Sequence, residues 1–97
     1  MLTHIVVWKY KSDVSEAERD EHVRRLQALA SIIPEVQSLT VGRDQLHLAR
    51  SYDTGLVATF RDRAGLDAYT VHPDHEEVAA MGRRISAHVT SVDFEDE

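Results

Sequence analysis

The 97-residue sequence contains no cysteine. Disulfide bonds, a thiolate nucleophile, cysteine-ligated zinc and iron–sulfur clusters are therefore excluded. No apolar run approaches the ~18 residues that a membrane-spanning helix needs, and the N-terminus lacks the pattern of a signal peptide. We therefore expect a cytoplasmic protein that does not interact with membranes.

Basic residues are scarce as well. The chain has 11 Lys and Arg against 17 Asp and Glu, which gives a formal net charge of -6. Nucleic acids and anionic membranes both require a basic surface, so neither is expected as a partner. Hydrophobic residues make up 42% of the chain and charged residues 29%, which is typical of a globular protein. The length predicts one domain, residues 1–97.

The chain has only two prolines, and each marks the end of a helix. Ser15 and Glu18 form a capping-box pattern that starts the first helix, and Pro34 ends it. His22 lies toward the edge of the apolar stripe of this helix, so we interpret it as a boundary residue. That stripe follows helical spacing and comprises Val23, Leu26, Leu29, Ala30 and Ile33.

The second proline divides a later helical region in two. Asp62 is placed to cap a short helix, which should stop near Val71 because Pro73 disfavours helical backbone at His72. A further helix should then begin with Pro73 at its first position, where the missing N–H costs nothing.

Four stretches have the β-branched and aromatic composition of strands: Leu2–Lys11, Glu35–Gln45, Tyr52–Phe60 and His88–Glu95, the last leading into an acidic tail at residues 95–97. The order strand–helix–strand–strand–helix–strand predicts an α+β, ferredoxin-like fold with an antiparallel sheet and helices on one face. The first strand is apolar on both faces. We therefore predict a homodimer in which two sheets face each other and close a β-barrel.

The break between the two later helices carries a phenol and two imidazoles, in Tyr69-Thr-Val-His-Pro-Asp-His75. One hypothesis is that Tyr69 and His75 exchange a proton with a small ligand. The alternative is a helix–helix corner with solvated histidines. A metal site at His72, Asp74 and His75 matches no zinc signature, so we predict neither a metal nor another cofactor.

Several segments together resemble the stress-responsive dimeric α+β barrel (Dabb) family: His4-Ile-Val-Val-Trp-Lys-Tyr-Lys11, Val41-Gly-Arg-Asp44, Ser51-Tyr-Asp53, Phe60, the Tyr69–His75 run and Val92-Asp-Phe94. The resemblance implies a ferredoxin-like unit that dimerises into a barrel. One plant branch of the family consists of cofactor-free polyketide cyclases. By similarity to that branch, Tyr69, His75 and His4 are the candidate catalytic residues.

His4 shares a strand face with Val6 and Trp8, so these two should line the same cleft. We expect Leu26, Leu56 and His72 to contact a bound ligand there as well. Where the cyclase branch has a further histidine this chain has Thr54, and Trp8 replaces smaller groups, so its indole could fill the pocket.

Three functions stay open from the sequence. The first is a stress-related homodimer that binds a small apolar or carbonyl-containing molecule in a cleft between helices and sheet. The second is a cofactor-free cyclase, lyase or isomerase that uses the Tyr–His pair. The third is a structural assembly protein. A cavity that reaches Tyr69 and His75 together would favour the enzyme.

Overall fold

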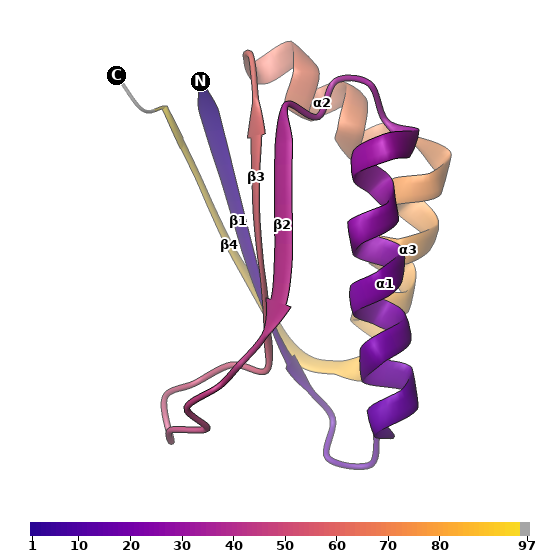
Figure 1. Cartoon of the computed structure of the whole chain (residues 1–97), viewed down its shortest axis with the longest axis vertical. Coiled ribbons are helices and arrows are strands. Elements are labelled where there is room, and N and C mark those ends of the chain that lie inside the picture. The colour runs from indigo at the N-terminus through magenta and orange to yellow at the C-terminus, as the bar shows by residue number, and fades with distance from the viewer. Residues whose placement is uncertain (96–97) are drawn as a thin grey trace.

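In the part of the chain that the structure describes, a four-stranded sheet is covered on one face by three helices (Figure 1). The computed structural model describes residues 1–95, so positions 96 and 97 of the expected acidic tail lie outside the described residues. The elements are β1 (Leu2–Tyr10), α1 (Glu16–Ile32), β2 (Ser38–Arg43), β3 (Thr54–Phe60), α2 (Arg63–Val71), α3 (Pro73–Ile85) and β4 (Ser86–Glu95).

The strand order is β2-β3-β1-β4, and every neighbouring pair is antiparallel. This confirms the ferredoxin-like α+β fold predicted from the sequence. The predicted second strand was too long, because only 38–43 pair with β3 as a regular strand. The last strand starts earlier than predicted, at Ser86, directly after α3. No helix within residues 1–95 is long and apolar enough to cross a membrane.

The predicted helix ends are confirmed. The Ser15 side chain accepts a hydrogen bond from the Glu18 N–H, and the Asp62 carboxylate accepts one from the Gly65 N–H. Each of these bonds satisfies a backbone donor that the first turn of a helix leaves free. Helix α2 ends at Val71 and α3 begins at Pro73, as the restrictions around proline require.

Strand β1 lies between β3 and β4, and its residues alternate between two environments. The face toward the helices carries Trp8 and Tyr10, which are buried and belong to the same hydrophobic core as Leu29 and Phe60. Because residues paired across antiparallel strands share a face, β3 and β4 add their partners to the same layer.

No helix of the described residues covers the opposite face of the sheet. Ile5 of β1 pairs with Val57 of β3 and Val92 of β4, and Thr3 pairs with Phe94. Val57, Val92 and Phe94 are 44–52% exposed in the single chain. An apolar strip therefore crosses three adjacent strands on the open face, as the sequence of β1 led us to expect.

The prediction that His22 is a boundary residue was wrong, because its side chain is completely buried. It lies one helical turn before Leu26, on the buried side of α1. Its Nδ1 lies 2.8 Å from the Tyr10 hydroxyl, which donates a 2.8 Å hydrogen bond to Thr54 Oγ1. Burial lowers the pKa of His22 from 6.5 to about 4, and the charge of Arg25 contributes further. His22 is thus a neutral core residue that joins α1 to the sheet.

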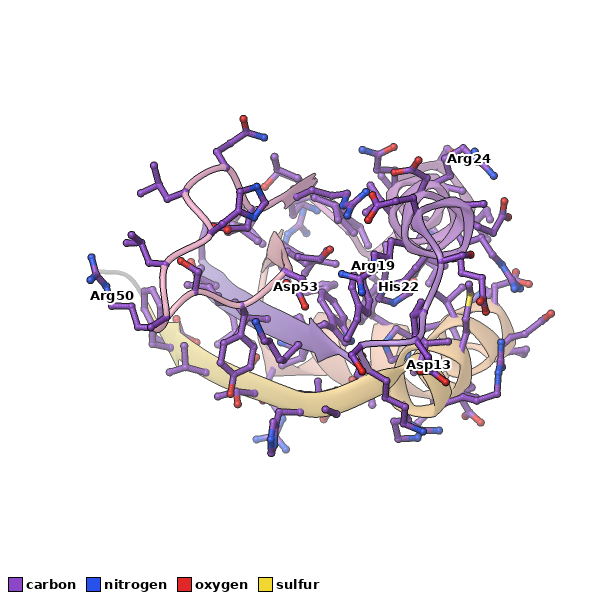
Figure 2. The ribbon with its side chains drawn as sticks, turned by 90° about the horizontal axis from the view of Figure 1, so that it is seen from below. Asp13, Arg19, His22, Arg24, Arg50 and Asp53 are labelled. Carbon is purple, nitrogen blue, oxygen red and sulfur yellow. The ribbon has the colours of Figure 1, made fainter. Side chains whose placement is uncertain are left out.

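At the end of the sheet seen in Figure 2, Asp53 connects the long loop between β2 and β3 to neighbouring elements. Its carboxylate accepts a 2.8 Å hydrogen bond from the Tyr10 N–H and lies 4.0 Å from the Arg19 guanidinium of α1. The exposed Arg50 marks the far end of the same loop. A single carboxylate therefore ties this loop to both β1 and α1.

His22 should make the stability of the protein depend on pH. Between pH 6.5 and about 4 the unfolded chain binds a proton at His22 that the folded chain does not. Stability should therefore fall as the pH falls through this window, by on the order of 3 kcal/mol at its lower end. Urea unfolding of the wild type and His22→Gln at pH 7 and at pH 4.5 measures the difference. Equal pH dependence in both proteins would show that folding does not lower the pKa of His22.

Candidate functional site

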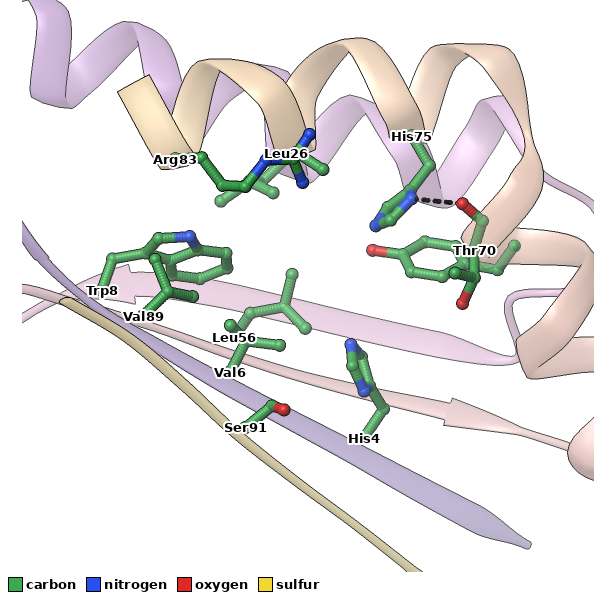
Figure 3. Close-up of a pocket in the computed structure, with 12 residues that line it drawn as sticks. His4, Val6, Trp8, Leu26, Leu56, Thr70, His75, Arg83, Val89 and Ser91 are labelled. Atoms are coloured by element: carbon green, nitrogen blue, oxygen red, sulfur yellow. Dashed lines mark hydrogen bonds between the residues drawn. The ribbon is translucent and has the colours of Figure 1, made fainter. Parts of the chain in front are cut away.

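A cavity of about 210 Å³ lies between the helices and the sheet, near the break between α2 and α3 (Figure 3). Its floor comes from β1, β3 and β4, and its other walls come from the helices. The residues that line it are His4, Val6, Trp8, Leu26, Leu56, Tyr69, Thr70, His75, Ala79, Arg83, Val89 and Ser91. One end is polar and the rest is mainly aliphatic or aromatic, which is typical of small-molecule sites.

Seven of the eight residues predicted to form the site line this cavity: His4, Val6, Trp8, Leu26, Leu56, Tyr69 and His75. The eighth, His72, does not. It is the N-cap residue of α3, and its Nδ1 accepts a 3.1 Å hydrogen bond from the Asp74 N–H. The imidazole accepts a hydrogen bond from a free backbone N–H at the start of α3, which explains why it does not face the cavity.

Sequence reasoning missed five lining residues: Thr70, Ala79, Arg83, Val89 and Ser91. Two of them could have been found from helical spacing, since Ala79 and Arg83 follow His75 at intervals of four residues. Val89 and Ser91 stand opposite Trp8 and Val6 across the β1–β4 pair. Finding these two requires the strand register, which the sequence alone does not give.

Trp8 forms a wall of the cavity and does not fill it. Its indole is 7% exposed and packs edge-on against His22, with 5.0 Å between ring centroids. Gly82 of α3 leaves room for the ring, because a Cβ at this glycine would lie only 2.9 Å from the indole Nε1. The absence of a side chain at Gly82 therefore lets α3 pack closely against the indole, which lines the cavity.

Tyr69 and His75 lie next to each other at the polar end of the cavity. Their ring centroids are 4.3 Å apart and the rings are inclined by 45°. No direct hydrogen bond joins the two side chains within residues 1–95, so each is available to a ligand. Burial raises the pKa of Tyr69 to about 12, so its hydroxyl keeps its proton at neutral pH.

The break between α2 and α3 orients His75. In an uninterrupted helix the Thr70 carbonyl would accept from the N–H of residue 74, but that N–H donates to His72. The free carbonyl accepts a 3.0 Å hydrogen bond from His75 Nδ1 instead. In the neutral ring this leaves Nε2 without a proton. Burial lowers the pKa of His75, the bond to Thr70 opposes the shift, and the nearby His4 adds to it.

His4 faces the same end of the cavity from the sheet. It stands opposite Asp93 in the β1–β4 register, and its Nδ1 donates a hydrogen bond to the Asp93 carboxylate. Its ring meets Tyr69 edge-on, with 6.1 Å between centroids. The carboxylate fixes the orientation of the ring through Nδ1, so Nε2 is the ring nitrogen that is not bonded to Asp93. Figure 3 shows the imidazole rising from the sheet toward the side of the cavity where His75 lies.

The arrangement brings together an uncharged base, a protonated phenol and an imidazole held by a carboxylate, all next to aliphatic walls. Such a set can accept a proton at one point and stabilise negative charge at another. No group of three or more His, Asp or Glu side chains within residues 1–95 is arranged to hold a metal ion, including the set His72, Asp74 and His75.

The hydrogen bond to Thr70 predicts a specific tautomer of His75. Long-range ¹H–¹⁵N NMR spectra at pH 7 should show Nδ1 protonated and Nε2 unprotonated, because a carbonyl can only accept. His75 should also titrate below its usual range, since burial disfavours the charged ring. A ring protonated at Nε2, or at both nitrogens at pH 7, would contradict the geometry described above.

Comparison with known proteins agrees with the fold. A family model described as the stress responsive A/B barrel domain matches residues 2–96. A stress-response A/B barrel domain-containing protein of Arabidopsis thaliana is 32% identical over 94 residues, which cover 94% of this chain and 82% of the relative. Olivetolic acid cyclase of Cannabis sativa is 28% identical over 76 residues, which cover 76% of this chain and 75% of the cyclase.

Among solved structures, a dimeric ferredoxin-like protein of unknown function from Thermobifida fusca superposes with a TM-score of 0.87. It is 28% identical in sequence, and the alignment covers 96% of this chain and 88% of the other. The chain therefore belongs to the stress responsive A/B barrel domain family.

Proposed function

We propose that the protein is a cofactor-free enzyme that binds a small, largely apolar carbonyl compound and transfers protons on it. The observation that carries this proposal is that one cavity reaches Tyr69, His75 and His4 together while Trp8 leaves it open. A site filled by the indole would have favoured binding or assembly instead. The similarity to a protein named as a cyclase supports the same class of chemistry.

The first step follows from the protonation states. His75 Nε2 is unprotonated and faces the ligand, so it accepts a proton from the carbon next to the carbonyl group. The electron pair of the broken C–H bond moves toward the carbonyl oxygen and forms an enolate. The Tyr69 hydroxyl keeps its proton and donates a hydrogen bond to that oxygen as its charge grows.

The second step decides the product. Return of the proton to the other end of the enolate system gives an isomer. Attack of the enolate carbon on a second carbonyl group of the same molecule closes a ring, and the new alkoxide then takes the proton from His75. His4, held by Asp93, is placed to pass a proton to or from the opposite side of the ligand. Neither route needs an oxidant or a reductant.

The proposal also includes a homodimer. The open sheet face carries Ile5, Val57, Val92 and Phe94, and no layer formed by residues 1–95 covers them. Two such faces packed together would remove this surface from water, at ~25 cal/mol per Å² of apolar area. The Thermobifida fusca protein is described as dimeric, which supports the same arrangement here. The cavity lies on the helix side and stays accessible.

Exchange of carbon-bound hydrogen tests the chemistry. The protein should accelerate deuterium incorporation next to the carbonyl groups of an unbranched β-diketone in D₂O, measured by NMR against buffer. Tyr69→Phe and His75→Gln should each lower the rate by ~10²-fold or more, the usual contribution of a positioned acid or base. His47→Gln is the matched control, because this side chain is 78% exposed on a loop outside the cavity. Binding of the diketone without exchange would leave a binding protein and refute the enzyme.

Sedimentation velocity tests the dimer. The wild type should sediment as a dimer at micromolar concentration. Val57→Asp should abolish the dimer, because a buried unpaired carboxylate costs several kcal/mol. Val71→Asp is the control, since Val71 is 66% exposed at the end of α2, away from the open face. A folded wild-type monomer, or a dimer that tolerates Val57→Asp, would contradict the proposed interface.

A further inference from the structure

Arg83 brings a positive charge to the wall of the cavity. It lies two helical turns after His75 and one after Ala79, so the three residues share one face of α3. Figure 3 shows its side chain extending along the helix above the cavity, with the guanidinium reaching toward the His75 side. The charge of Arg83 is also one cause of the lowered pKa of His75, so the guanidinium acts on this end of the site.

The Arg83 guanidinium has no protein partner within residues 1–95. Five other arginines lie within 4.0 Å of a carboxylate oxygen: Arg19, Arg24, Arg25, Arg43 and Arg63. Arg50, Arg61 and Arg84 make no such ion pair in the same part of the chain either, but none of them lines the cavity. Acidic residues outnumber basic ones by 17 to 11, so a shortage of carboxylates does not explain the unpaired Arg83.

The helix dipole does not explain Arg83 either. A basic residue in the last turn of a helix is favoured by the macrodipole, but Arg84 obtains the same benefit without lining the cavity. What distinguishes Arg83 is its position beside an otherwise apolar wall formed by Trp8, Leu26 and Val89. A planar guanidinium in such a position matches a carboxylate through two parallel hydrogen bonds.

We propose that Arg83 is an anion subsite of the cavity and that the natural ligand is an apolar oxo acid whose carboxylate pairs with this guanidinium. This inference rests on the proposed function, since it places the carbonyl group of the same ligand at Tyr69 and His75. The pairing fixes the ligand at one end, so that only one orientation brings the carbon next to the carbonyl toward His75 Nε2. Arg83 thus selects and positions the substrate and takes no part in the proton transfer.

A ligand without a carbonyl group tests the anion subsite separately from the chemistry. Hexanoate should bind to the wild type at pH 7, measured by isothermal titration calorimetry, at least tenfold more tightly than its neutral methyl ester. Arg83→Gln should remove this preference, because an ion-paired hydrogen bond contributes ~1.5–3 kcal/mol, a factor of ~10–100 in Kd. Arg83→Lys should keep part of it, since lysine has the charge without the planar pair of donors.

Arg84→Gln is the matched control, because it removes the same charge from the neighbouring position outside the cavity. It should leave the affinity for hexanoate unchanged. Absence of hexanoate binding, equal binding of acid and ester, or equal effects of the two substitutions would each overturn the anion subsite. The enzyme proposal fails on a different result, namely the lack of hydrogen exchange on a bound carbonyl compound, so the two failures are distinguishable.

Discussion

The alternation of the β1 side chains between the cavity and the open face is the constraint on which the rest of the structure depends. Because successive side chains alternate, one strand supplies His4 and Trp8 to the cavity and Ile5 to the open face. Its antiparallel pairing with β4 brings Asp93 opposite His4, which gives the imidazole a carboxylate partner. A shift of one residue in this register would exchange the two faces. It would remove His4 and Trp8 from the cavity and the apolar strip from the open face at the same time.

Much of the fold could be predicted because its signals are local. Strand alternation, the caps at Ser15 and Asp62 and the break at Pro73 each depend on a few neighbouring residues, and the structure confirms them. The errors had equally physical causes. His22 was misplaced because an imidazole counts as polar, yet its position in the helix is buried and Tyr10 satisfies Nδ1. Residues that line the cavity from β4 depend on strand register, which no local pattern encodes.

Proline chemistry links the backbone to the proposed base. Pro73 cannot donate a hydrogen bond and restricts the residue before it, so α2 ends and a new helix begins. The interruption frees the Thr70 carbonyl, which then orients His75. A backbone oxygen adds no formal charge, in contrast to the Asp93 carboxylate at His4. The two imidazoles of the site are thus held by partners of different charge, which suits them to different parts of one proton transfer.

The cavity and the open face lie on opposite sides of the same sheet. A dimer formed through the open faces would therefore carry two candidate sites that point outward, with two sheets between them. Each candidate site would then be filled independently of the other, because two sheets would separate them. In such an assembly the second copy would complete a hydrophobic core, and each subunit would contain a whole candidate site.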